Sequence, residues 1–158
     1  MAVEARGSRF SRTNNLITAA VMILLGAWFT YDGWFSADFQ QKNTVDGKPN
    51  IDLKINRYVP ALLFPLGLYF VYQAQRMSKR KITADEKGLT LENGNQIAYE
   101  QFTQIDNRFF AKEGHFTMEY KDGGETRKLK FSDRQYDGLG LLLDEIVKKT
   151  GAAPPEEK

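Results

Sequence analysis

The stretch RMSKRKITADEKGLTLENG, residues 76–94, separates two kinds of sequence. The segment before it, VPALLFPLGLYFVY, is uncharged and apolar. The stretch itself begins with four cations within six residues, namely Arg76, Lys79, Arg80 and Lys81. After it, apolar residues recur at every second position, which is typical of β-strands. The stretch therefore marks the boundary between an apolar helical part and a small β domain.

The composition limits the chemistry that the chain can perform. Its 158 residues fit one domain with an appendage, and its net charge of +2 is not that of a bulk polyelectrolyte. There is no Cys, so a disulfide, a thiolate nucleophile and a Cys-ligated metal are excluded. A single histidine, His115, restricts general-base catalysis and metal binding. We expect no catalytic residue, cofactor, metal, nucleic-acid partner or small-molecule substrate.

Two uncharged stretches predict two transmembrane helices. Residues 13–31 lie between Arg12 and Asp32, and residues 58–75 lie between Arg57 and Arg76. About 20 such residues are needed to cross the hydrocarbon layer of a bilayer. We therefore expect spans at 13–35 and 58–75. Two alternatives are a soluble core with two buried helices and a cleaved signal peptide, although the first stretch is long for a signal peptide and no A-x-A site follows it.

The cations near the spans predict the orientation. Seven cations stand just before the first span or just after the second, and four are spread through the loop between the spans. The positive-inside rule then places both termini in the cytoplasm of a bacterial inner membrane. The expected organisation is a cytoplasmic segment 1–12, the two spans, an extracytoplasmic loop 36–57, a cytoplasmic domain 76–150 and a flexible tail 151–158. Within the loop, the alternation in IDLKI suggests a short strand or a segment on the membrane surface.

Residues beyond 81 predict an antiparallel meander of four to five strands closed by a C-terminal helix. Asn93-Gly94 joins two alternating segments and is a strong hairpin signal. The segments QIDNRFFA, HFTMEY and ETRKLKF read as further strands. Ser132 and Gln135 form a capping-box pattern that predicts the start of the helix. One apolar helix face then contains Tyr136, Leu139, Leu143, Ile146 and Thr150.

The segment ITADEKGLTLENGNQIAYEQFTQIDN resembles the opening of small bacterial pleckstrin-homology-like (PH-like) domains, including those of YcxB-like membrane proteins. The resemblance covers about 70 residues, 81–149, and members often have two spans ahead of the domain. It implies an α+β PH-like fold and a membrane location, and it carries over no catalytic residue. Tyr99 departs from the pattern, because many members have Trp there.

Several residues are candidates for contacts rather than catalysis. Arg76, Lys79, Arg80 and Lys81 are candidates for contact with the membrane surface, with a purely topological role as the alternative. Gly26, Ala61 and Gly67 are candidates for close helix packing with a partner. Asp32 and Arg57 either pair at the interface or mark the ends of the spans. His115 and the turn carboxylates read as ordinary surface groups.

These patterns predict a non-enzymatic inner-membrane protein that anchors a small interaction domain, as a scaffold or an accessory subunit of a membrane assembly. Its expected partners are the lipid bilayer and other membrane proteins or further copies of itself. The first alternative is a module that senses anionic lipid through a patch of Arg108, Arg127, Lys128 and Lys130. The second is an enzyme whose site is not visible in the sequence.

Overall fold

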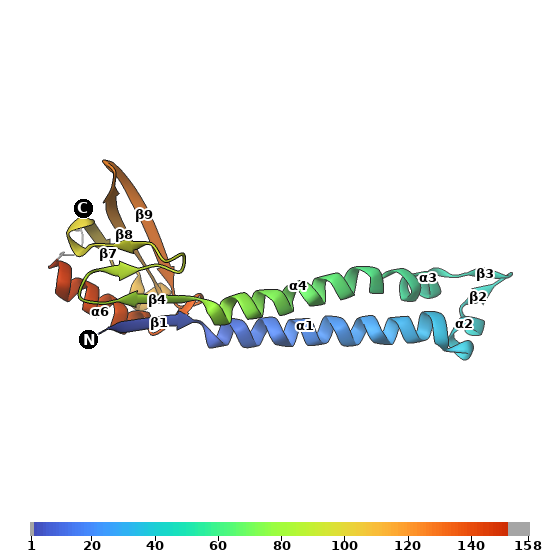
Figure 1. Cartoon of the computed structure of the whole chain (residues 1–158). Coiled ribbons are helices and arrows are strands. Elements are labelled where there is room, and N and C mark those ends of the chain that lie inside the picture. The colour runs from blue at the N-terminus through green and yellow to red at the C-terminus, as the bar shows by residue number, and fades with distance from the viewer. Residues whose placement is uncertain (1, 152–158) are drawn as a thin grey trace. The chain divides into compact units, whose positions relative to one another are not determined.

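The computed structural model describes residues 2–151, and these divide into two compact units. The β unit combines the residues up to Ser11 with those from Arg76 onward, and the helical unit comprises residues 12–75. Figure 1 shows the strands and α6 of the β unit and the long helices α1 and α4 of the helical unit. The expected tail lies outside the described residues, apart from Gly151. The fold is mixed helix and sheet, as the sequence predicts.

One sheet of the β unit has five short strands in the order β10-β1-β4-β5-β6. Its strands are β1 (Val3–Gly7), β4 (Lys81–Ala84), β5 (Leu89–Thr90), β6 (Gln96–Ile97) and β10 (Tyr136–Asp137). All neighbours are antiparallel. The predicted hairpin at Asn93-Gly94 is confirmed, because Leu89 pairs with Ile97 across it.

The strand β1 comes from a segment to which the sequence analysis gave no structure. It lies between β4 and β10, where Val3 pairs with Ala84 and Gly7 pairs with Tyr136. Ala5 at its centre is 0% exposed. The β unit therefore combines strands from both sides of the helical unit in the sequence. The alternation of Val3 and Ala5 was the only local signal for this strand.

The second sheet has three strands in the order β7-β8-β9. They are β7 (Phe102–Asp106), β8 (His115–Asp122) and β9 (Glu125–Ser132). A 3-10 helix, η2 (Tyr99–Gln101), precedes β7, and the short helix α5 (Phe110–Glu113) separates β7 from β8. The predicted β8–β9 hairpin is confirmed, with Met118 opposite Leu129. The predicted single meander is wrong, because the strands form two sheets.

The C-terminal helix α6 (Leu139–Thr150) closes the core, but it begins later than the capping-box pattern predicts. Instead of starting a helix, Ser132 accepts a hydrogen bond from the backbone N–H of Gln135 at 2.9 Å, within a turn. The carbonyl of Gln135 in turn accepts a bond from Ser8 N at 2.9 Å. Pairing with β1 thus holds Tyr136 in a strand. The predicted helix face is confirmed at Leu139, Leu143 and Ile146, and Leu142, which was not predicted, is buried as well.

The helical unit is built on α1 (Arg9–Thr30) and α4 (Pro60–Lys79), which run antiparallel (Figure 1). Apart from Asn56, the buried residues of these two helices and of the elements that adjoin them recur every seven positions. These residues are Ala19, Gly26 and Gly33 from the α1 side, and Leu53, Pro60, Gly67 and Ala74 from the α4 side. Most of them are small, and small residues allow two helix backbones to approach closely.

The connection between α1 and α4 contains short elements of its own. A π-helix, η1 (Tyr31–Phe35), follows α1, and α2 (Ala37–Lys42), β2 (Thr44–Val45), β3 (Lys48–Pro49) and α3 (Ile51–Tyr58) complete it. The expectation of a strand over IDLKI is wrong, because α3 is helical. The side chain of Asn50 caps this helix by accepting a hydrogen bond from Leu53 N at 2.9 Å, and Leu53 then packs inside.

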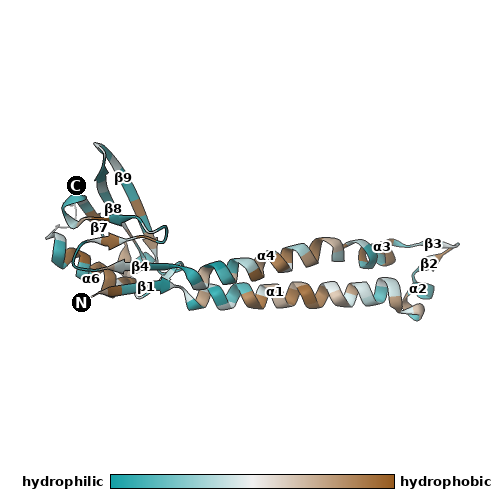
Figure 2. Cartoon of the chain, in the orientation of Figure 1, coloured by the Kyte–Doolittle hydropathy of each residue, from teal (hydrophilic) through white to brown (hydrophobic). Residues whose placement is uncertain are grey.

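One helix among the described residues is long and apolar enough to cross a membrane, and it runs from Arg9 to Phe35. Only 17% of its most apolar 18 residues are buried within the chain, whereas the core helix of a soluble protein is mostly buried. Figure 2 shows the hydrophobic residues that it carries along its length. The second stretch is also helical, but α4 does not reach the same hydropathy, since Gln73 and Gln75 lie within its uncharged part.

Candidate functional site

The four cations of the predicted membrane-contact run, Arg76 to Lys81, divide into two pairs with different surroundings. Arg80 and Lys81 are engaged inside the β unit: Arg80 Nε lies 3.6 Å from Glu92 Oε1, and Lys81 Nζ lies 2.5 Å from Glu4 Oε1. Arg76 and Lys79 lie in the last turn of α4 and are exposed. No ion pair forms at these two residues within the described part of the chain. Only half of the run is therefore available to an external anion.

Arg80 belongs to a partly buried polar cluster that no sequence pattern indicated. The Tyr136 hydroxyl donates a hydrogen bond to Glu92 Oε1, and the buried Arg80 Nε lies 3.6 Å from the same carboxylate oxygen. Burial, together with this bond to a carboxylate, raises the pKa of Tyr136. The three residues come from β10, from the turn after β5 and from the position that follows α4, so no sequence spacing connects them. Their contacts join the segment that follows α4 to β10.

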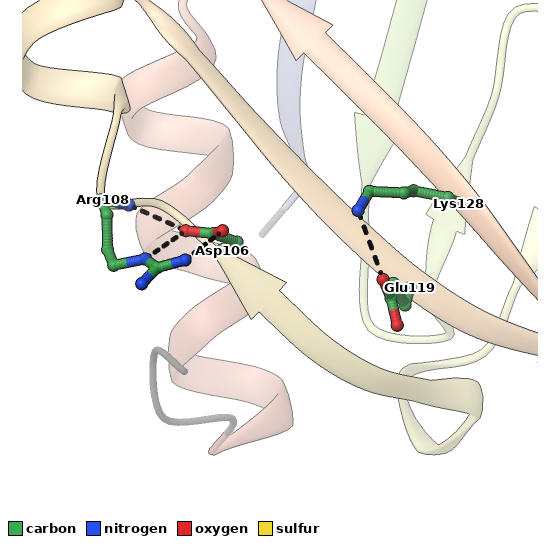
Figure 3. Close-up of polar contacts among 4 residues, drawn as sticks. All are labelled: Asp106, Arg108, Glu119 and Lys128. Atoms are coloured by element: carbon green, nitrogen blue, oxygen red, sulfur yellow. Dashed lines mark hydrogen bonds and ion pairs between the residues drawn. The ribbon is translucent and has the colours of Figure 1, made fainter. Parts of the chain in front are cut away.

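The cations expected to form a lipid-sensing patch do not converge. Arg108 is 2.9 Å from Asp106, and Lys128 is 3.4 Å from Glu119, as two separate pairs in Figure 3. The hydrogen bond from the Arg108 side chain lowers the pKa of Asp106. Each of these cations is partly neutralised where it stands.

The other two cations of the expected patch are also separated from each other. Arg127 lies 2.8 Å from Asp122 near the turn of the β8–β9 hairpin. Strand alternation places Arg127 and Lys128 on opposite faces of β9. Lys130, on the face of Lys128, has no ion pair with any described residue. A single cationic concavity is therefore not formed by these four residues.

Two of the three predicted helix-packing residues pack within the chain. A Cβ added to Gly26 would lie 3.3 Å from the Phe64 ring, and one added to Gly67 would lie 2.8 Å from Ile23 Cγ1. Both glycines are buried between α1 and α4, whereas Ala61 is exposed. The small residues thus serve the intrachain helix pair.

Asp32 and Arg57 do not pair with each other in a salt bridge but each is engaged near the end of α1. Trp28 Nε1 donates to the Asp32 carboxylate at 2.8 Å. Arg57 Nε donates to the carbonyl of Gly33 at 3.0 Å, and its guanidinium lies 5.0 Å from the centre of the Trp34 ring. The Gly33 carbonyl lies in the π-helix, and Arg57 is its hydrogen-bond donor.

His115 is more enclosed than a plain surface histidine. Its side chain is 19% exposed, its ring stacks on Phe109 at 5.7 Å, and Nδ1 lies 3.5 Å from Glu113 Oε2. Within residues 2–151, no group of three or more His, Asp and Glu side chains is placed to hold a metal ion. The imidazole lines a cavity that no sequence pattern indicated.

The chain matches no family model, and neither the curated proteins nor the solved structures contain a significant match to it.

Proposed function

We propose that this is a non-enzymatic protein of a bacterial inner membrane that holds a small PH-like interaction domain, the β unit, at the cytoplasmic face. In this role it is a scaffold or an accessory subunit of a membrane assembly. The observation that carries the proposal is the pairing of β1 with β4, from Val3–Ala84 to Arg6–Lys81. These neighbouring strands stand on either side of the helical unit in the sequence.

That pairing limits how the helical unit can relate to a membrane. The open edges of a small sheet have unpaired backbone groups, which cannot be left in the hydrocarbon layer of a bilayer. The paired strands β1 and β4 must therefore lie together in water, on one side of the membrane. The chain between β1 and β4 must then cross the membrane an even number of times. Since the helix from Arg9 to Phe35 is suited to one crossing, α4 is the natural return. These observations support a two-span hairpin.

The surface of the helical unit supports the same proposal. Many large hydrophobic side chains are exposed along α1 and η1, and six of them are spaced alternately by four and three residues. These six are Ile17, Val21, Leu24, Trp28, Tyr31 and Phe35. On α4, Leu62, Leu66 and Tyr69 are exposed with similar spacing. An exposed apolar surface of this extent is costly in water and favourable against acyl chains.

The scaffold role is preferred to lipid sensing because of the charge distribution in the β unit. Arg108, Arg127 and Lys128 each have a carboxylate within 3.4 Å, and so they offer little net charge to a bilayer. The non-enzymatic assignment rests on the absence of Cys and the single His in the sequence. The PH-like assignment is supported by two antiparallel sheets closed by a C-terminal helix.

The topology can be tested by labelling single cysteines, since the chain has no native Cys. Arg6→Cys in β1, Lys87→Cys after β4 and Asp46→Cys between β2 and β3 all replace exposed side chains. We expect a membrane-impermeant maleimide to label only Asp46→Cys in intact spheroplasts, and to label the other two in inside-out vesicles. Equal labelling of all three from one side would contradict the two-span hairpin.

The scaffold role needs a separate measurement. Purification of the full chain in mild detergent, followed by mass spectrometry, should yield partners in stoichiometric amounts. A variant with an unfolded β unit, such as Leu142→Asp, should lose them while remaining in the membrane. If the same partners are retained by that variant, the β unit is not the interaction domain.

A further inference from the structure

The β unit contains an open cavity of about 650 Å³, and among the cations discussed above only Lys130 lines it. It is formed where α5 turns into β8 and where β9 ends. Its volume falls within the usual range of small-molecule sites, about 300–1,000 Å³. Lys112, Lys130 and Arg134 line it together with Glu113, His115 and Asp133.

The Lys and Arg side chains of this cavity are not paired with its carboxylates in the described part of the chain, and Glu113 pairs only with His115. Lys112, Lys130 and Arg134 come from three different segments, and none of them has an ion pair among the described residues. By contrast, Arg6, Arg80, Lys81, Arg108, Arg127 and Lys128 in the same unit each lie within 4 Å of a carboxylate. Asp133 likewise lacks a cation partner within residues 2–151. Unpaired charges of both signs thus line a single concavity.

The wall of the cavity is held by backbone and ring contacts. Asp133 N donates to the carbonyl of Gly114 at 2.8 Å, which ties the end of β9 to the start of β8. Gly114 has a φ of +66°, and a Cβ at this position would collide with the Asp133 carboxylate. His115 is fixed from the other side by stacking on Phe109. The charged groups are therefore presented by a defined backbone rather than by a loose loop.

We propose that this cavity binds a phosphate ester that also carries a primary ammonium group, the chemistry of ethanolamine phosphate. Lys112, Lys130 and Arg134 supply charged donors for the phosphate oxygens, for which Arg and Lys are well suited. The carboxylates of Glu113 and Asp133 are acceptors for the ammonium group. A simple anion would gain nothing from these two carboxylates, whereas a ligand with both charges uses all five groups. The same headgroup can belong to a free metabolite or to a lipid.

The single histidine makes this cavity observable in the full chain. His115 is the only His in the sequence, so a protein purified without a histidine tag gives one imidazole Cε1–Hε1 signal in an NMR spectrum. In maltoside micelles, at constant pH and ionic strength, we expect O-phosphoethanolamine to shift this signal saturably. Inorganic phosphate should require a higher concentration, and ethanolamine alone a higher one still.

Variants separate the two halves of the site. Lys130→Gln or Arg134→Gln should weaken O-phosphoethanolamine about tenfold, because a charged hydrogen bond is lost. Asp133→Asn should abolish the preference for O-phosphoethanolamine over inorganic phosphate. Lys121→Gln makes the same charge change on β8 outside the cavity and should bind as the natural chain does.

The source of the headgroup is read from the same signal in bicelles containing phosphatidylethanolamine or phosphatidylcholine. If a lipid is the ligand, His115 takes the saturated position only with phosphatidylethanolamine, and added O-phosphoethanolamine has no further effect. If a free metabolite is the ligand, both bicelles leave the signal in the unbound position and O-phosphoethanolamine titrates it. A shift that does not saturate, or one that the Lys130 and Arg134 variants leave unchanged, would overturn the proposal.

Discussion

The carboxylate of Glu4 lies 2.5 Å from the ammonium group of Lys81, across the pair of strands that begins and resumes the β unit. The guanidinium of Arg6 lies 3.1 Å from the same carboxylate. The helical unit separates Glu4 from Lys81 in the sequence, so this contact forms only when both ends of that unit return to one sheet. The contact is therefore present only when β1 and β4 are paired in the folded β unit.

Acid should lower the stability of the folded β unit through Glu4. The hydrogen bond from Lys81, and then that from Arg6, lowers the pKa of Glu4 from 4.5. A carboxyl whose pKa is lower in the folded state stabilises that state above its unfolded pKa, and this contribution is lost as pH falls through the folded pKa. We expect the urea midpoint of the natural chain to fall with pH below about 4.5 more steeply than that of Glu4→Gln. Glu125→Gln, at an exposed position, should retain the steep dependence.

The strand β1 should be required for the β unit to fold alone. A fragment of residues 76–151 lacks the strand between β4 and β10, which leaves Tyr136 without its backbone partner Gly7. We expect this fragment to unfold without a cooperative transition. Residues 1–11 joined to 76–151 through a short Gly-Ser linker should instead melt cooperatively, as followed by circular dichroism. Cooperative melting of the shorter fragment at the same temperature would show that β1 is dispensable.

The sequence predicted the local features of this fold better than its long-range pairings. Asn93-Gly94 and the alternation around Met118 depend on nearby residues, and both hairpins are present. The capping pattern at Ser132 failed because pairing with β1 competes for the same residues, and no local signal reveals that competitor. The Arg80–Glu92–Tyr136 cluster was missed for the same reason. Its members meet only in the folded chain.

Two adjacent leucines of α6 provide a matched test of the core. Leu142 is 0% exposed and Leu141 is 70% exposed. Leu142→Asp places an unpaired carboxylate in the core and should cost several kcal/mol, enough to unfold the β unit. Leu141→Asp makes the same chemical change in water and should be nearly neutral. Hydrogen exchange of the full chain in micelles distinguishes the two, and similar protection of β8 in both variants would contradict the assigned helix face.

Cysteine pairs can test whether Gly67 packs within the chain or against a partner. A Cβ at Gly67 would lie 3.4 Å from the Ala19 carbonyl oxygen, so Ala19→Cys with Gly67→Cys should cross-link within one chain under mild oxidation. Ala20→Cys with Gly67→Cys should not, because Ala20 is exposed. Electrophoresis under non-reducing conditions separates the products. A disulfide-linked dimer from Gly67→Cys alone would place this glycine between chains.

The hydroxyl of Tyr136 should make the β unit sensitive to alkali. Burial and the hydrogen bond to Glu92 raise the pKa of Tyr136, so the folded state retains this proton above the pH at which the unfolded chain loses it, about 10. A raised folded pKa means that the contribution to stability is complete below the unfolded pKa and is lost as pH rises through the folded pKa.

Tyr136→Phe removes a hydrogen bond to a charged acceptor, and we expect a loss of about 1–3 kcal/mol near neutral pH. Between about pH 9.5 and 11, the free energy of unfolding of the natural β unit should then fall more steeply than that of Tyr136→Phe, because only the former has this hydroxyl to ionise on unfolding. Urea titrations of the linked β unit measure both quantities. Tyr120→Phe changes a tyrosine for which the structure shows no hydroxyl bond and should keep the alkaline dependence. If Tyr136→Phe and Tyr120→Phe lose stability in parallel from pH 7 to 11, the Tyr136–Glu92 bond does not hold the two ends of the β unit.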